Sequence, residues 1–196
     1  MNDKALLLEK LRLELSALYP LDDAAWADFN SIWVPVNYKR KSIITAAGET
    51  EKYLYWVTEG VQRGFHLHEN KEATIVFSYP YSFSGIIDSF LMQQPSRYFL
   101  ETLSASSFLR TSFPQFEHVR RKWPSIAEVV YKMLSSTISG ILERQIELMV
   151  YTVEEKFRVL LKRSPHILNL VPHKYLASYL GIDPTTFSKL LSTVRI

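Results

Sequence analysis

The sequence contains no cysteine and only six glycines. The absence of cysteine excludes disulfide bonds, thiol catalysis and metal centres held by thiolates, including iron–sulfur clusters. No apolar run approaches the roughly 20 residues that a membrane-spanning helix needs. The chain begins Met1-Asn2-Asp3-Lys4 without an apolar segment or a signal-cleavage site, so we expect a soluble protein of the cytoplasm.

The residues that are present allow a substantial core and carry an uneven charge. With 196 residues and 47% hydrophobic content, the chain can form one large domain or two small ones. Residues 1–117 hold 11 Lys and Arg against 14 Asp and Glu, whereas residues 118–196 hold 12 against 6. A basic C-terminal part favours an acidic partner such as duplex DNA, although solvated helices are often basic without one.

The N-terminal half changes from a helical to a β-type pattern. Residues 3–18 alternate apolar and charged groups at helical spacing, which predicts a leading helix. Its apolar stripe consists of Leu7, Leu8, Leu11 and Leu15. From about 33 to 113, short β-rich runs such as residues 53–58 and 73–78 are separated by turn residues. Many short strands at close spacing predict a barrel or a sandwich.

A long helix is predicted after Pro124, with two apolar stripes. The first stripe consists of Ile126, Val130, Met133, Thr137, Ile141 and Leu148. The second consists of Val129, Leu134, Ile138 and Leu142. One stripe can pack on the β domain while the other binds a partner, and we assign the first to a dimer interface. A helix buried on both faces inside one subunit fits the pattern equally. The run from Thr152 to Glu155 reads as a capping box that starts a further helix.

Residues 173–192 have the spacing of a helix-turn-helix. The side chains expected in its core are Leu176, Ala177, Leu180, Ile182, Phe187 and Leu190. Gly181 falls in the turn, and Asp183 can cap a second helix that begins at Pro184. An αα-hairpin that only packs is the alternative interpretation.

The second helix of this motif would turn a polar face outward. Thr185, Ser188 and Lys189 are the candidates for contact with base edges. Thr186 at the start of the second helix, and His173 and Lys174 at the start of the first, lie where phosphates are usually bound. The sequence therefore predicts a nucleic-acid interface at these six residues.

The order of these parts resembles that of the Crp/Fnr family of bacterial transcription regulators. The segment from Ala47 to Arg63, which includes Gly48 and Gly60, is similar to the glycine-punctuated hairpins of the family's cyclic-nucleotide-binding β-roll. The resemblance implies an α+β fold in three parts. These are a leading helix and β-roll sensor (a double-stranded β-helix) over 1–120, a dimerisation helix over 121–150, and a helix-turn-helix of winged-helix type over 151–196. Only residues 193–196 follow the recognition helix, so we expect the wing to be truncated or missing.

The resemblance also implies a function and its partners. We expect a homodimeric, non-enzymatic regulator that binds a palindromic operator in double-stranded DNA. A small-molecule effector and RNA polymerase are the further partners that the resemblance suggests. No cofactor and no metal are expected.

The family's ligand cassette corresponds to Phe83, Gly85 and Ile86, followed by Ser96 and Arg97. By the resemblance, a glutamate that binds ribose belongs at Ile86, and an Arg-Ser pair belongs where Ser96-Arg97 stands in inverted order. Isoleucine cannot accept a hydrogen bond from a ribose hydroxyl, and a buried unpaired hydroxyl costs roughly 1–3 kcal/mol. We therefore expect an effector other than cyclic AMP. An ordinary surface arginine is the alternative interpretation of Arg97.

An enzyme is the competing hypothesis. His66, His68 and Glu72 follow Gly60 in a pattern similar to the first metal-binding motif of the cupins, and alternation places both histidines on one face of a strand. The second cupin motif is missing, because no histidine occurs between His68 and His118. Without that ligand, we interpret the pair as two polar residues on a solvated strand face, and the enzyme stays the minor hypothesis. No nucleophile elbow and no phosphate-binding glycine loop is present.

Overall fold

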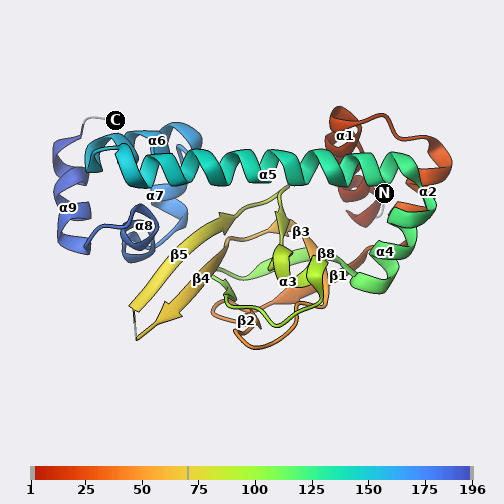
Figure 1. Cartoon of the computed structure of the whole chain (residues 1–196), viewed down its shortest axis with the longest axis horizontal. Coiled ribbons are helices and arrows are strands. Elements are labelled where there is room, and N and C mark those ends of the chain that lie inside the picture. The colour runs from red at the N-terminus through yellow and green to blue at the C-terminus, as the bar shows by residue number, and fades with distance from the viewer. Residues whose placement is uncertain (1–2, 70, 195–196) are drawn as a thin grey trace.

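The computed structural model describes residues 3–69 and 71–194. Figure 1 shows helices near the N-terminus, a β-roll, and a long helix, α5 (Pro124–Val150), which runs across the roll to a group of C-terminal helices. The fold is α+β, with a roll followed by a helical C-terminal region, as the sequence predicts. None of the described helices is long and apolar enough to cross a membrane.

Two helices precede the roll. α1 (Asp3–Leu18) turns one face to the core because its leucines recur at helical spacing. The buried residues of this face are Leu8, Leu11 and Leu15. Leu7 packs at the edge of the same cluster. α2 (Asp23–Ser31) is absent from the sequence-based prediction, although its start signal is present: Asp22 Oδ1 accepts a hydrogen bond from the Ala25 amide at 2.8 Å.

The roll consists of two antiparallel four-stranded sheets, with strand orders β1-β8-β3-β6 and β2-β7-β4-β5. The strands are β1 (Val34–Tyr38), β2 (Ile43–Thr45), β3 (Tyr53–Glu59), β4 (Gln62–His68), β5 (Lys71–Ser78), β6 (Phe83–Ser84), β7 (Phe99–Thr102) and β8 (Ser106–Ser112). The short helix α3 (Ile87–Met92) connects β6 to β7. The predicted arrangement of many short strands is confirmed.

β3 is buried on both faces, which explains its nearly continuous apolar sequence. Leu54 and Trp56 pack with α1 and α2 outside the roll. Tyr55 and Val57 point between the two sheets and pack with Leu100 of the other sheet. One strand therefore supports both the helical layer and the roll interior.

The two glycines in the predicted hairpins occupy tight turns. Gly48 and Gly60 have φ values of +89° and +84°. A Cβ atom added to Gly60 would lie 2.4 Å from the carbonyl oxygen of Ala105, so a side chain cannot be accommodated without moving the backbone. The turn requires glycine for its space as well as for its conformation.

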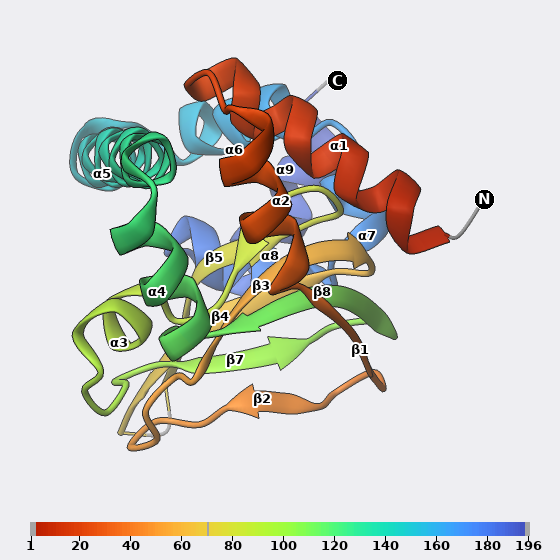
Figure 2. The same cartoon turned by 90° about the vertical axis from the view of Figure 1, so that its right-hand side faces the viewer.

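α4 (Phe113–Lys122) leads from the roll into α5, and Figure 2, in which α5 is seen end-on, shows α4 descending to the sheets. Asp28 of α2 fixes this junction. Its Oδ2 accepts hydrogen bonds from Lys122 Nζ at 2.6 Å and from Trp123 Nε1 at 2.8 Å. The Lys122 contact, followed by that of Trp123, lowers the pKa of Asp28. The start of α5 is thus held by polar groups as well as by apolar packing.

The C-terminal region contains α6 (Val153–Arg163), α7 (Ile167–Leu170), α8 (His173–Leu180) and α9 (Pro184–Thr193). The capping box at α6 is confirmed: the Glu155 carboxylate accepts the Thr152 amide at 2.7 Å, and Thr152 Oγ1 accepts the Glu155 amide at 3.3 Å. Within the described residues no strand follows α9. Arg195 and Ile196, part of the predicted truncated wing, lie outside them.

The buried face of α1 can be tested by a matched pair of substitutions. Leu11→Ala should reduce the free energy of unfolding by about 2–5 kcal/mol, because Leu11 is 0% exposed and its removal leaves a cavity. Leu13→Ala, at a residue that is 66% exposed, should change it by less than about 0.5 kcal/mol. Chemical denaturation measures both, and equal losses would contradict the assigned face.

Candidate nucleic-acid interface and roll cavity

α8 and α9 form the helix-turn-helix that the sequence predicts. Gly181 ends α8 with φ of +69°, and the amide of Ile182 donates to the Ala177 carbonyl at 3.0 Å. Asp183 Oδ1 then accepts the Thr186 amide at 2.9 Å, which caps α9. The turn between the helices is therefore set by a glycine C-cap and an aspartate N-cap within three residues.

The expected core of the motif is buried. Leu176, Ala177, Leu180 and Phe187 are 0% exposed, and Leu190 is 9% exposed. Ile182 is only half-buried because it lies in the turn, but it packs against the same cluster. α6 completes the core through Phe157, whose ring meets that of Phe187 edge-on at 5.6 Å. The motif is a packed three-helix unit.

α9 turns Thr185, Ser188 and Lys189 to solvent. Ser188 Oγ donates to the Pro184 carbonyl at 3.0 Å, so it has acceptor capacity left for a ligand but its proton is used. Among the described residues, Lys189 takes part in no ion pair. Thr186 is half-buried, and both its amide and its hydroxyl bind Asp183. Of the four predicted residues on this helix, Lys189 offers the strongest free donor.

The start of α8 lies beside α9. The ring of His173 is 5.4 Å from that of Phe187, and both His173 and Lys174 are exposed. Lys174 Nζ lies 4.6 Å from the centroid of the Tyr175 ring. The six predicted residues are thus brought to two adjacent helix starts and one helix face.

The helix-turn-helix is docked on the roll of the same chain. Ser178 Oγ donates to the Glu72 carbonyl at 3.0 Å and accepts the Thr74 amide at 2.9 Å. β5 is the outer strand of its sheet, so these backbone groups would otherwise lack a protein partner. Val61 and Leu103 of the roll belong to the same buried cluster as the core of the motif.

Arg63 of β4 is buried at this junction, with 2% exposure. Its Nη1 donates to Glu72 at 2.6 Å and its Nε to Glu101 at 2.8 Å. The guanidinium carbon lies 3.7 Å from the centroid of the Tyr175 ring of α8. Sequence patterns do not indicate this role, because the aromatic partner is far along the chain.

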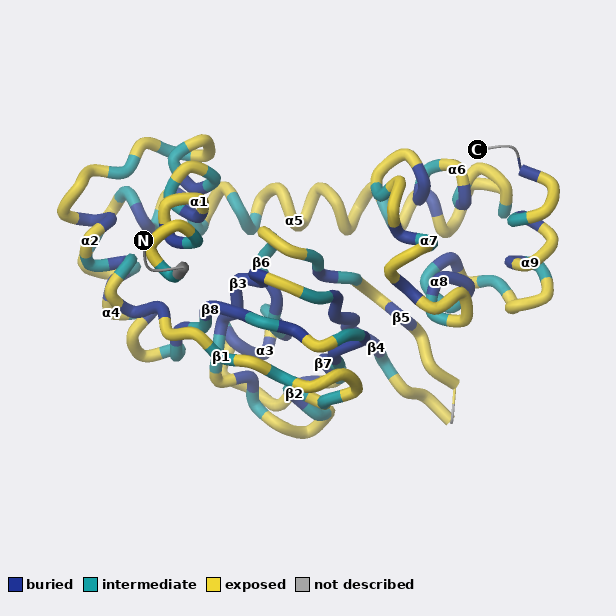
Figure 3. The backbone as a smooth tube through the Cα atoms, turned by 180° about the vertical axis from the view of Figure 1, so that it is seen from behind, coloured by how far each residue is buried: buried dark blue, intermediate teal, exposed yellow. Residues whose placement is uncertain are grey.

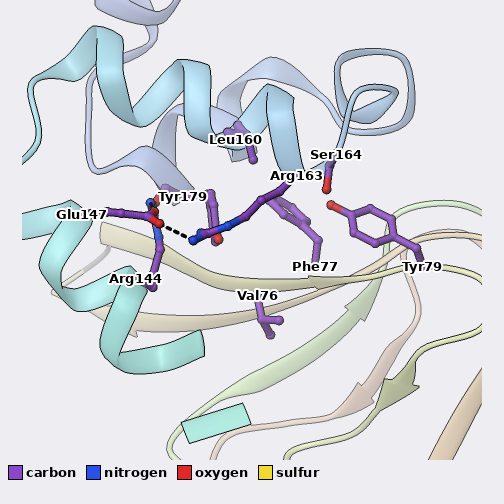
Figure 4. Close-up of a pocket in the computed structure, with 9 residues that line it drawn as sticks. All are labelled: Val76, Phe77, Tyr79, Arg144, Glu147, Leu160, Arg163, Ser164 and Tyr179. Atoms are coloured by element: carbon purple, nitrogen blue, oxygen red, sulfur yellow. Dashed lines mark hydrogen bonds and ion pairs between the residues drawn. The ribbon is translucent and has the colours of Figure 1, made fainter. Parts of the chain in front are cut away.

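A small cavity of about 110 Å³ lies where β5, α5, α6 and α8 meet (Figure 4). Glu147 is 3% exposed. Its carboxylate forms ion pairs with Arg144 Nη1 at 3.0 Å and with Arg163 Nη2 at 2.6 Å. Arg144 also donates to the Tyr179 carbonyl. Burial raises the pKa of Tyr79, on the opposite wall, to about 12. These charges are paired within the chain, and the contacts form a joint between α5, α6 and α8.

The predicted dimer face on α5 is divided by the structure. Ile126 is 1% exposed, and Val130 and Met133 pack against the chain's own core. The burial of Ile126 corrects its assignment to a partner, because α1 and α4 already cover that side of the helix. Thr137, Ile141 and Leu148 are exposed, and Figure 3 shows the middle of α5 exposed on its surface.

The second stripe of α5 is likewise divided, and it is exposed at Ile138 and Leu142. Ile138 is 58% exposed and Leu142 55% exposed. Tyr131 (67%) and Met149 (75%), which belong to neither predicted stripe, extend this exposed apolar face along the helix. Leu134 is half-buried, and Val129 is buried. A Cβ atom added to Gly140 would meet nothing within 4 Å, so no described residue requires glycine there for space. Among residues 3–69 and 71–194, little covers the apolar face of the helix from Tyr131 to Met149.

The residues of the predicted ligand cassette form hydrogen bonds within the chain or are exposed to solvent. The Ile86 amide donates to Glu51 Oε2 at 3.4 Å, and the Ser96 hydroxyl accepts the Tyr98 amide at 2.8 Å. Phe83 is half-buried, and Gly85 has φ of +132°. Arg97 is exposed, and its carbonyl oxygen lies 2.9 Å from His66 Nδ1. Phe83 packs with Trp33 in the outer cluster, at 6.1 Å between ring centroids, whereas Ile86 belongs to the cluster between the sheets. The five residues therefore do not gather into one open set of donors.

Glu51 is the residue of this region that sequence reasoning missed. It is 1% exposed, and its carboxylate accepts hydrogen bonds from Thr45 Oγ1 at 2.7 Å and from the Tyr53 amide at 3.1 Å. Burial raises its pKa, and the Thr45 hydrogen bond opposes that change. Glu51 also lines a cavity of about 420 Å³ between the sheets, together with Tyr38, Tyr53 and Tyr55.

The residues of the enzyme hypothesis do not form a metal site. The His66 and His68 rings are stacked with centroids 6.5 Å apart, and the Glu72 carboxylate is paired with Arg63. Among residues 3–69 and 71–194, no group of three or more His, Cys, Asp or Glu side chains could hold a metal ion. The cupin-like alternative is not favoured by this arrangement.

Comparison with known proteins supports the fold. No family model and no curated protein matches the sequence. FixK2 from Bradyrhizobium japonicum matches with a TM-score of 0.73 over 82% of this chain and 83% of its own, at 17% identity. A transcriptional regulator of the Crp/Fnr family from Eubacterium rectale gives 0.69 over 88% and 82%, at 13% identity. The c-di-GMP-responsive global regulator CLP from Xanthomonas campestris gives 0.66 over 87% and 90%, at 15% identity.

Each of these matches covers more than four fifths of this chain. At such low identity they establish a shared fold. The chain therefore has the fold of Crp/Fnr-type regulators, a cyclic-nucleotide-binding-type roll joined to a helix-turn-helix, and the fold that the resemblance implied is confirmed.

The docking of α8 on the roll can be tested at Ser178. Ser178→Ala leaves the Thr74 amide, in a residue 6% exposed, without its acceptor and should cost about 1–3 kcal/mol of unfolding free energy. Hydrogen exchange at Thr74 should become faster. Ser135→Ala on exposed α5 is the control and should change neither quantity. Unchanged exchange at Thr74 would contradict the docking.

Proposed function

We propose that the chain is a DNA-binding transcription regulator of Crp/Fnr type that acts as a homodimer in the cytoplasm and has no enzymatic activity. The proposal rests above all on the complete helix-turn-helix with Thr185, Ser188 and Lys189 exposed on α9. Residues 1–120 would sense an effector, residues 121–150 would dimerise, and residues 151–196 would read a palindromic operator. RNA polymerase is the candidate partner at the promoter.

Charge supports DNA as the partner. The excess of basic over acidic residues is confined to positions 118–196, which include α6, α8 and α9. His173 and Lys174 stand exposed beside α9, where phosphates adjoining a bound major groove would lie. Attraction to phosphate and a helix suited to the groove thus occur on one surface.

A second copy of the chain is the proposed partner of α5. Between Leu134 and Leu142 the helix contains Ser, Thr and Gly, which are weaker helix formers than alanine. The described residues leave the outer face of this stretch uncovered. The exposed positions 131, 138, 142 and 149 recur at a spacing of seven or four, as in a helix that pairs with another helix. A two-fold pair would also supply the two reading helices that a palindrome needs.

The effector proposed for the roll is a small molecule other than cyclic AMP. The Ile86 amide and the Ser96 hydroxyl are already bound within the chain, and Arg97 is exposed. The buried Glu51 carboxylate beside Ile86 would repel a cyclic phosphate. A ribose at this place would therefore lack hydrogen-bond partners.

Substitution of the two lysines should separate base reading from phosphate binding. Lys189→Ala should cost about 1–3 kcal/mol in binding and relax preference at one base pair, because a lysine on α9 can donate to guanine. Lys174→Ala should weaken binding to all DNA sequences alike. It should also reduce the slope of log binding constant against log salt concentration by about 0.9 for each phosphate that is no longer neutralised. Selection of bound sequences from a random pool, with titrations at several salt concentrations, measures both effects.

The control for these variants is Lys10→Ala on α1, outside the C-terminal helices, which should bind DNA as the unmodified chain does. If Lys189→Ala leaves both the affinity and the consensus sequence unchanged, α9 does not read DNA through this face. If the unmodified chain selects no sequence at all, DNA binding itself is the wrong function.

The dimer should depend on the second stripe of α5. Ile138→Glu should produce a monomer and weaken binding to a palindrome whose half-sites are about 34 Å apart, because a charge would be buried between two helices. Ser136→Glu, exposed on a different face of the same helix, should leave the dimer intact. Light scattering at micromolar concentration decides the matter. A monomeric unmodified chain that stays monomeric on DNA would refute the dimer.

A further inference from the structure

The cavity between the sheets of the roll has a lining rich in tyrosine and carboxylate. Its volume is about 420 Å³, within the range of roughly 300–1,000 Å³ found for small-molecule sites. Three tyrosines, two glutamates, two threonines, one isoleucine and one lysine form its walls. Aromatic rings and hydrogen-bonding groups thus dominate the cavity, and carboxylates outnumber cations among the lining residues.

The charge deepest in this lining is negative. Glu51 is 1% exposed, whereas Glu49 and Lys52 are exposed at the mouth. The donors that reach Glu51 are a hydroxyl and backbone amides, which stabilise a carboxylate without neutralising it. No ion pair involving Glu51 occurs among the described residues. A ligand placed against Glu51 would therefore gain most from carrying a positive charge.

The tyrosines of the cavity provide the second feature that a cation requires. Tyr38 packs edge-on against Tyr55, with centroids 6.4 Å apart, and Tyr53 lies next to Tyr55 at 6.2 Å. Arg110 of β8 already stacks its guanidinium on Tyr53, 4.2 Å from the ring centroid. The ring faces of this cluster thus hold one cation that belongs to the chain itself. Aromatic rings combined with a carboxylate are the usual means of binding amines and quaternary ammonium groups.

We propose that the roll cavity binds an organic cation, a primary amine or a quaternary ammonium compound, against Glu51 and the ring of Tyr38. This inference rests on the proposed function, because it identifies the chemical class of the effector. It also reverses the charge of the ligand relative to a cyclic nucleotide. The positively charged end would face Glu51, and the body of the ligand would contact the tyrosines.

Two pairs of probes with matched shapes test the charge preference. Choline is compared with 3,3-dimethylbutan-1-ol, its uncharged carbon isostere, and phenethylamine with 2-phenylethanol. Cyclic AMP is the anionic comparator. Each compound is titrated into the full-length chain by calorimetry, and the shift of the thermal unfolding midpoint is recorded in parallel. At least one cation should bind saturably and about tenfold or more tightly than its neutral partner.

Three variants connect the preference to named side chains. Glu51→Gln keeps the size of the side chain but removes its charge, so the preference for the cation should fall to about the level of the neutral isostere. Tyr38→Leu should weaken binding of the cation more than binding of the neutral isostere. It serves as an independent variant if Glu51→Gln does not fold. Glu9→Gln, exposed on α1, is the matched control and should bind as the unmodified chain does.

The outcomes separate this inference from the proposed function. Equal binding of cations and isosteres, or no saturable binding of either cation, overturns the cation site. Retained preference in both Glu51→Gln and Tyr38→Leu overturns its placement. Tight binding of cyclic AMP would refute the exclusion of that nucleotide as well. Selection of DNA sequences by the same preparation is measured independently, so a regulator without a cation site and a protein without DNA binding give different results.

Discussion

The buried guanidinium of Arg63 is the interaction on which the arrangement of the two halves depends. A cation removed from water is tolerated only with well-placed partners, and here Glu72 and Glu101 come from the roll while Tyr175 comes from α8. Docking of the helix-turn-helix adds the Tyr175 ring to a cation whose two carboxylate partners belong to the roll. Because the roll and the helix-turn-helix also share an apolar cluster, any reorientation of α9 must disturb both.

Opposite electrostatic requirements are kept apart along the molecule. The surface around α8 and α9 exposes lysine and histidine, whereas the roll encloses a carboxylate among tyrosines. Between them, the joint at Glu147 pairs its charges internally with Arg144 and Arg163. The charges that lie between the two regions are thus compensated within the chain.

The parts that sequence could predict are those defined by neighbouring residues. Gly181, Asp183 and Pro184 specify a turn and a helix start among themselves, and the capping box at Thr152 does the same. Periodicity locates α5 but cannot tell which stripe α1 and α4 cover, so it assigns Ile126 to the wrong neighbour. Glu51 and Arg63 escape sequence-based prediction because their burial depends on segments distant in the chain. The DNA contacts and the dimer stay predictions.

The exposed middle of α5 makes the stability of this helix depend on the concentration of the protein. Ser135 and Thr137 direct their hydroxyls to carbonyls of their own helix, and little from the rest of the chain covers this stretch. Such a helix persists because both its ends are anchored, and its central turns are the most easily opened. Pairing with a second copy would close them by mass action, at a gain that grows with protomer concentration. A cell that makes little of this protein would then hold a larger fraction in the opened form that proteases attack first.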